Sequence, residues 1–256
     1  MRLIVISDYL GHEGYLEPLR EVVEEDDFDA LVFTGGMAEG KESISEYTRA
    51  LVEGREPGKD KEGITEEKKK KKEDIKKFLE YLTKFDLPVL FIPGHTDTPL
   101  EMYEDLVNIA LDKTQNLHYV HLKFLQLDKF IFSGCGGIIG DESEEFFQYK
   151  IPVSELKSRL RNLKTFRQEK IMIVHTPPSI GEGEEIEEAS EYVDEVIKFL
   201  KPKILFYGMI DPGNKMRVIN DTVVITPGPL SEGNYCVVNT KTMSVEFENL
   251  DVDEED

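Results

Sequence analysis

The sequence predicts an α/β fold in which two mixed β-sheets carry helices on their outer sides, a four-layer α/β/β/α sandwich. Strand and helix patterns alternate through the first half of the chain, which is typical of a parallel sheet built from βαβ units. The second half holds many strand patterns and few helical ones, and two sheets would accommodate them. The chain of 256 residues is 39% hydrophobic, which suits a large core.

Strands and helices alternate in the first half. Apolar, β-branched runs predict strands at residues 2–7, 30–36 and 88–94. A helix follows the first strand, with Leu16, Leu19 and Val23 on one face. Thr98, followed by a proline and then by Glu101, predicts a capping box at the start of another helix. The loop between the third strand and this helix is therefore tight.

A charged helical insertion is predicted at about residues 54–84, between the second and third strands. A turn-rich segment comes first, and one helix then covers residues 65–85 with Thr65 as its N-cap. Five consecutive lysines, residues 68–72, invite a nucleic-acid or targeting interpretation. Glutamates flank them, so we expect a solvated turn instead. The buried stripe of the helix is expected to consist of Ile75, Phe78, Leu79 and Leu82.

The second half predicts the remaining strands and two helices. The strands are expected at residues 118–124, 130–138, 170–176, 203–209, 222–228, 234–240 and 243–250. The helices are expected at residues 154–166 and 186–200. We expect a single domain over residues 1–250, followed by an acidic, frayed tail at residues 251–256.

The charge balance excludes several classes of partner. Lys and Arg total 31 against 52 Asp and Glu, which gives a formal net charge of −21. Such a surface repels a phosphate backbone, so we expect no nucleic acid and no anionic membrane as partner. A small phosphorylated substrate held through a metal ion stays compatible with it.

Composition also bears on localisation. We find no apolar run long enough to cross a bilayer, and residues 1–8 fit a first strand better than a signal peptide. We therefore expect a cytoplasmic protein. The content of Lys and Glu, without Trp, is compatible with a thermophile.

Polar residues follow several of the predicted strands. They are Asp8, His95, Asp97, His175 and Asp211, each in an otherwise apolar setting. The carboxyl ends of parallel strands meet at one edge of a sheet, where ligands bind in open α/β folds. These residues therefore predict a functional site at that edge.

The order of these residues resembles the motif series of the calcineurin-like metallophosphoesterases: Asp-x-His, Gly-Asp, Gly-Asn-His-Asp/Glu, a lone His, and Gly-His-x-His. The similarity extends from Asp8 to "TPGPLSEGNY" and is closest to a divergent branch with "HTPP" and "PG…SEG" stretches. The resemblance implies a metallophosphoesterase-like sandwich. It also implies two metal ions about 3.5–4 Å apart that clamp a phosphate and generate a hydroxide nucleophile. An aspartate of the second motif bridges the two ions.

The first, second and fourth motifs are only partly kept. Asp8 matches the first ligand and His175 matches the lone histidine. Leu10 stands where the first motif has its histidine, and Gly36 stands where the bridging aspartate is expected. Loss of the bridge removes the group that holds two cations together, so the resemblance implies one ion at most.

The third and last motifs are also altered. His95 occupies the asparagine position and Thr96 the position of the catalytic histidine, while Asp97 is retained. Met209 and Asp211 replace the two histidines of the last motif. No residue can therefore be assigned as the catalytic group.

The motif residues that remain predict a site for a single metal ion. Asp8, His95, His175 and Asp211 are the candidate ligands of one divalent ion, either Mn, Zn or Fe. The alternative is that no metal binds. Asp8 and Asp211 can also cap turns, His95 can cap the following helix, and His175 can bond to nearby backbone.

Three residues are candidates for substrate contact: Tyr9, Thr96 and Asp97. Two of them have a structural alternative. Tyr9 can pack in the core, and Asp97 can anchor loop backbone.

Two function hypotheses follow. The first is a divergent, single-metal phosphoesterase acting on a small phosphorylated molecule, with a metal-bound water as nucleophile. The second is a catalytically inactive protein of the same fold that serves as a ligand- or protein-binding module. A phosphorylated ligand would then bind at the helix N-terminus after Asp97.

Overall fold

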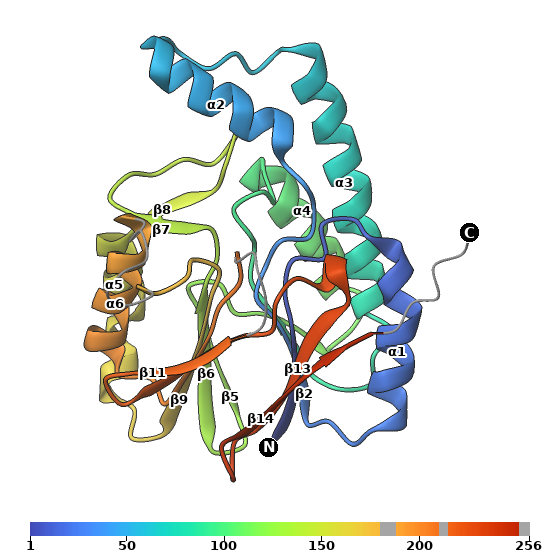
Figure 1. The fold of residues 1–256 in the computed structure, drawn as a ribbon, viewed down its shortest axis with the longest axis vertical. Helices are drawn as coiled ribbons and strands as arrows, with labels where there is room; N and C mark the ends of the chain where they lie inside the picture. The colour runs from blue at the N-terminus through green and yellow to red at the C-terminus, as the bar shows by residue number, and fades with distance from the viewer. Residues whose placement is uncertain (180–187, 210–214, 251–256) are drawn as a thin grey trace.

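The computed structural model describes residues 1–179, 188–209 and 215–250, and it confirms the four-layer sandwich (Figure 1). Within these residues, two mixed sheets of six strands each pack together. The first sheet has the order β14-β13-β1-β2-β3-β4, in which β1 to β4 run parallel. Its strands are β1 (Arg2–Ile6), β2 (Ala30–Phe33), β3 (Val89–Phe91), β4 (Leu117–Tyr119), β13 (Asn234–Asn239) and β14 (Ser244–Asn249).

The second sheet has the order β11-β12-β10-β9-β6-β5, with antiparallel strands at both edges. Its strands are β5 (Phe124–Leu127), β6 (Phe130–Cys135), β9 (Glu169–Val174), β10 (Ile204–Phe206), β11 (Lys215–Ile219) and β12 (Thr222–Thr226). A short parallel pair, β7 (Ile138–Gly140) and β8 (Lys150–Pro152), lies beside it. The predicted tail at residues 251–256 and the start of the predicted helix 186–200 lie outside the described residues.

Strand β1 shows how the sequence builds the layers. Leu3 and Val5 face the core between the two sheets, whereas Ile4 and Ile6 face the helices on the outer side. Successive side chains of a strand point to opposite faces, so a strand buried on both faces needs an unbroken apolar run. The central strands therefore appear in the sequence as continuous apolar segments.

Helices cover both outer faces. The first sheet is covered by α1 (Leu16–Glu25), α3 (Glu62–Leu82) and α4 (Leu100–Leu111). The second sheet is covered by α5 (Val153–Leu160) and α6 (Glu188–Leu200). The stripe predicted for the insertion is confirmed, because Ile75, Phe78, Leu79 and Leu82 are all buried against the first sheet. Among the described residues, no helix is long and apolar enough to cross a membrane.

The insertion differs from the prediction at its start. Helix α2 (Lys41–Glu53), which the patterns did not predict, precedes it. Helix α3 begins at Glu62 with Lys61 as N-cap, so Thr65 lies inside the helix. Its hydroxyl donates to the Lys61 carbonyl oxygen at 3.1 Å. The helix extends back because Ile64 is buried, which ties its first turn to the rest of the protein.

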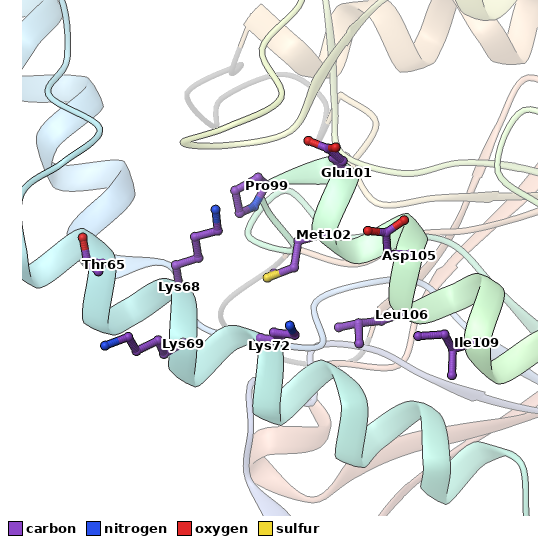
Figure 2. Close-up of a pocket in the computed structure, with 10 residues that line it drawn as sticks. All are labelled: Thr65, Lys68, Lys69, Lys72, Pro99, Glu101, Met102, Asp105, Leu106 and Ile109. Atoms are coloured by element: carbon purple, nitrogen blue, oxygen red, sulfur yellow. The ribbon is translucent and has the colours of Figure 1, made fainter.

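The run of lysines is not uniformly solvated. Figure 2 shows Lys68, Lys69 and Lys72 beside a hollow between α3 and α4, across from Glu101 and Asp105. These three lysines are exposed, as predicted. Lys71 is instead only 2% exposed, because its position on α3 turns it toward the body of the protein.

Lys71 joins α3 to two other segments. Its ammonium lies 3.2 Å from the Glu67 carboxylate and donates to the Thr98 hydroxyl, also at 3.2 Å. Glu67 in turn accepts the backbone N–H groups of Glu42 and Ser43, at 2.6 and 3.1 Å, and so caps the N-terminus of α2. The capping box predicted at Thr98 is therefore wrong. The N-cap of α4 is Pro99, and the Thr98 hydroxyl serves Lys71.

The strand predicted at residues 118–124 is divided into β4 and β5. Leu122 adopts a positive φ of 53°, which ends the extended chain between them. His121 lies in this connection, where Nδ1 accepts the Gly136 N–H and Nε2 bonds to the Tyr149 hydroxyl. It has a structural role there.

We expect Lys71→Met to lower the free energy of unfolding by about 3 kcal/mol, because it removes one partner of a buried ion pair. Urea denaturation followed by circular dichroism measures this change. The matched control is Lys72→Met on the exposed side of the same helix, which should stay within about 0.5 kcal/mol of the parent. Equal effects of the two substitutions would contradict the role assigned to Lys71.

Candidate active site

Glycines bring the loops after β2 and β3 into direct backbone contact. A Cβ added at Gly94 would lie 2.3 Å from the Gly36 nitrogen, and one at Gly35 would lie 2.7 Å from the Gly94 nitrogen. Gly35 and Gly36 also have φ values of 98° and 87°, which favour glycine. The two loops can approach this closely only because these side chains are absent.

Asp97 fastens the same two loops together. Its Oδ1 accepts the N–H groups of Met37 and Ala38 at 2.8 and 3.0 Å. Its Oδ2 accepts those of Gly94 and Gly36 at 2.6 and 3.2 Å. The residue is fully buried. Both carboxylate oxygens are thus engaged with the protein backbone, as expected of a structural anchor.

Asp8 lies at the end of β1 and packs against the loop after β2. Its Oδ2 accepts the Ser7 hydroxyl and the Met209 N–H, the latter at 3.0 Å. Its Oδ1 occupies the space beside Gly36, where an added Cβ would lie only 2.4 Å away. The position at which a bridging aspartate is expected is therefore closed by Asp8 itself.

The side chains of His95 and His175 are hydrogen-bonded to each other. His175 is fully buried, and its Nδ1 lies 2.9 Å from the Thr34 carbonyl oxygen. A carbonyl only accepts, so His175 carries its proton on Nδ1 and leaves Nε2 as an acceptor. His95 Nδ1 lies 2.9 Å from that Nε2 and donates to it. His95 Nε2 is then the one ring nitrogen of the pair without a partner among these bonds.

Burial keeps His95 neutral. It lowers the pKa of His95 to about 3, with smaller contributions from the nearby His175 and Lys71. Protonation at Nε2 would place a positive charge in a buried setting, close to the Lys71 ammonium. At neutral pH His95 therefore keeps Nε2 unprotonated.

A pocket with a cavity volume of about 570 Å³ opens at this edge of the sheets. Three of its lining residues, Asp8, Leu10 and Met209, have positive φ values of 49°, 53° and 59°. A left-handed conformation costs a residue with a side chain about 1–2 kcal/mol. Strain of this kind is concentrated at functional sites, which marks the pocket as the candidate site.

The structure brings some of the predicted site residues together and separates others. Asp8, His95 and Thr96 line the pocket, and His175 lies behind His95. Tyr9 is fully buried in the core, where it stacks on Phe78 at a centroid distance of 4.4 Å. Asp97 is enclosed by backbone, as described above. Asp211 lies outside the described residues.

The sequence patterns missed one wall of the pocket. Lys41, Ile44 and Ser45 come from the first turns of α2, and Glu232 comes from the 3-10 helix η3 (Leu230–Glu232). The signal that could have identified α2 is Gly54, which ends the helix in the left-handed conformation. Without that helix, no sequence argument places Lys41 near Asp8.

The residues present do not fit a two-metal centre. Both ring nitrogens of His175 are engaged, one with Thr34 and the other with His95. Asp8 Oδ2 already accepts two donors, and Gly36 contributes no carboxylate. Within residues 1–179, 188–209 and 215–250, no three histidine, cysteine or carboxylate side chains form a group that could hold a metal ion.

The comparisons with known proteins agree with the fold. A family model described as metallophosphoesterase, calcineurin superfamily, matches residues 1–250. One solved structure superposes with a TM-score of 0.87 at 23% identity, covering 98% of this chain and 99% of the other. The crystal structure of TT1561 of Thermus thermophilus gives a TM-score of 0.76 at 24% identity with the same coverage.

A more distant similarity is to the crystal structure of 5'-nucleotidase from Candida albicans. Its TM-score is 0.54 at 15% identity, and the match covers 99% of this chain and 54% of that one. No curated protein sequence matches the chain. At these identities the solved structures support the fold alone.

We expect Gly36→Ala to lower the free energy of unfolding by about 3 kcal/mol. The new methyl group would collide with Asp8 Oδ1 and would hold a positive φ that alanine disfavours. Denaturant unfolding measures the change. The control is Gly140→Ala, where no atom lies within 4 Å of the added carbon. A Gly36→Ala protein as stable as the control would show that the site has room for a side chain.

A second prediction concerns the protonation of His95. Its pKa of about 3 lies below the value of about 6.5 in the unfolded chain. The unfolded chain therefore takes up this proton first, so His95 lowers the stability of the fold as the pH falls from about 6.5 to about 3. Long-range ¹⁵N–¹H spectra at pH 5 should show His95 neutral and protonated at Nδ1. The same titration in denaturant is the control, and a doubly protonated His95 ring at pH 5 in the folded protein would refute the lowered pKa of His95.

Proposed function

Since the chain belongs to the calcineurin superfamily of metallophosphoesterases, we propose that it uses the fold's pocket to bind a small molecule without metal-dependent hydrolysis. The observation that carries the proposal is the hydrogen bonding of the His175 ring. Its two ring nitrogens are engaged with Thr34 and His95, so the lone pair of the residue that best matches a family ligand already accepts a hydrogen bond. The pocket itself is retained.

The loss of the bridging position supports the same proposal. The family chemistry depends on two cations held by a shared carboxylate. Asp8 fills the space next to Gly36, so the polypeptide has closed the position rather than left it open. The two histidines hydrogen-bond to each other, and Asp8 accepts hydrogen bonds from Ser7 and Met209, so these side chains have partners without a metal ion.

The alternative is a single-metal phosphoesterase with Asp8, His95, His175 and Asp211 as ligands. It requires His175 to release either the His95 N–H, in a partly buried setting, or the Thr34 carbonyl oxygen, which is buried. Leaving a buried polar group unpaired costs about 1–3 kcal/mol. Asp211 lies outside the described residues and adds no support.

A protein partner is the other binding hypothesis. It would be favoured by one large exposed apolar patch. The exposed large apolar side chains lie instead on several elements, among them Val52 on α2, Ile109 on α4, Phe124 on β5 and Val218 on β11. The pocket is the better supported binding site, because its lining combines strained backbone, apolar walls and polar groups.

We expect purified protein, incubated with Mn²⁺ or Zn²⁺ and desalted, to retain well below one ion per chain by elemental analysis. We also expect its rate of bis(4-nitrophenyl) phosphate hydrolysis with Mn²⁺ to equal that of His95→Gln. The reason for both expectations is that His95 and His175 are hydrogen-bonded to each other instead of to a metal ion.

The comparison with His95→Gln controls for contaminating phosphatases, which the substitution does not affect. One tightly held ion, together with a rate that falls in the variant, would establish the single-metal alternative. Retention of two ions per chain would contradict the inference that Gly36 leaves no bridging carboxylate for a second metal ion.

A further inference from the structure

The charges around the pocket are predominantly negative. Asp8, Glu39 and Glu232 line it with carboxylates, and Lys41 is the cationic residue among the described lining. The Lys41 ammonium lies 3.1 Å from Glu39 and its side chain is 80% exposed, so it is paired and solvated. That pair offsets the charge of Glu39, and the carboxylates of Asp8 and Glu232 remain in excess, so an anionic ligand would be repelled and a cation attracted.

The hydrogen-bonding groups of the pocket are mainly acceptors. The bond from His175 to Thr34 fixes the tautomer of both histidines, so His95 keeps a lone pair on Nε2. Thr96 also lines the pocket and is only 5% exposed, and its buried hydroxyl has no hydrogen-bond partner among the described residues. His95 Nε2 therefore needs a donor from the ligand, whereas the Thr96 hydroxyl can either donate or accept.

The groups that could hold a phosphate are already engaged. Helix α2 begins at the pocket, and a helix N-terminus binds anions well. Here the Glu67 carboxylate already takes the N–H groups of Glu42 and Ser43. Lys71 is buried and paired with Glu67. The protein supplies its own anion where a phosphorylated ligand would need the site free.

The remaining walls are apolar. Leu10, Ile44, Met209 and Pro229 line the same cavity of about 570 Å³, a volume that suits a small organic molecule. We propose that the pocket binds an organic cation, an ammonium group on an apolar body, in preference to a phosphorylated molecule. This inference rests on the proposed function, because it names the ligand class of the same pocket.

Three probes of similar shape test the proposal: 2-phenylethylammonium, 2-phenylethanol and phenyl phosphate. Each is titrated into ¹⁵N- and methyl-labelled protein at pH 7 and low salt, without amine buffers. We expect 2-phenylethylammonium to give saturable shifts at Leu10, Ile44 and Met209. The alcohol should bind at least about tenfold more weakly, since it lacks the charge that strengthens hydrogen bonds to carboxylates. Phenyl phosphate should not bind.

Carboxylate variants separate specific binding from general attraction to an acidic protein. Glu39→Gln and Glu232→Gln should each weaken ammonium binding by about fivefold to tenfold. Glu248→Gln is the matched control, because it removes the same charge from an exposed position on β14 and should leave the affinity unchanged. Equal weakening by all three variants would overturn the proposal.

The outcomes also distinguish a failure of the cation preference from a failure of the proposed binding function. Saturable binding of the alcohol or of phenyl phosphate at the same residues, with affinity equal to that of the ammonium compound, would overturn the cation preference and leave the binding function standing. Binding of phenyl phosphate only in the presence of Mn²⁺, with hydrolysis, would overturn the proposed function itself.

Discussion

The hydrogen bonds of Asp97 are the constraint on which the site depends. One buried carboxylate accepts four backbone N–H groups from the loops after β2 and β3. A buried charge is tolerated only where such donors surround it, so neither loop can move away without exposing an unsatisfied group. This anchoring fixes the backbone of His95 and thereby places its ring against His175.

The histidine pair follows from that placement. His95 and His175 follow strands of different sheets, and the face-to-face packing of the sheets brings their rings within hydrogen-bond distance, at 2.9 Å. Gly208 leaves room for the His175 ring, since a Cβ at residue 208 would lie 3.0 Å from His175 Nδ1. The result is a site in which side chains at positions typical of metal ligands are bonded to one another. Its chemistry is then that of a pocket with fixed acceptors.

The insertion determines the other wall of the pocket. Lys71 and Glu67 of α3 hold the N-terminus of α2 by an ion pair and a helix cap, and α2 then presents Lys41 and Ile44 to the cavity. The same contacts occupy the groups that could bind an anion. A segment that looks like a surface addition in the sequence therefore sets the shape and the charge of the candidate site.

The sequence alone determined the sandwich, because period-two burial and unbroken apolar runs depend only on which face of a strand each residue occupies. It also placed Asp8, His95 and His175 at the ends of strands, and it identified Gly36 as the position without a bridging carboxylate. It could not determine that Lys71 is buried, that the Thr98 hydroxyl accepts a hydrogen bond from Lys71 or that Tyr9 packs in the core. Tertiary structure decided these points, and also the bond between the two histidines. Each depends on hydrogen-bond partners and packing neighbours distant in the chain, which local patterns do not encode.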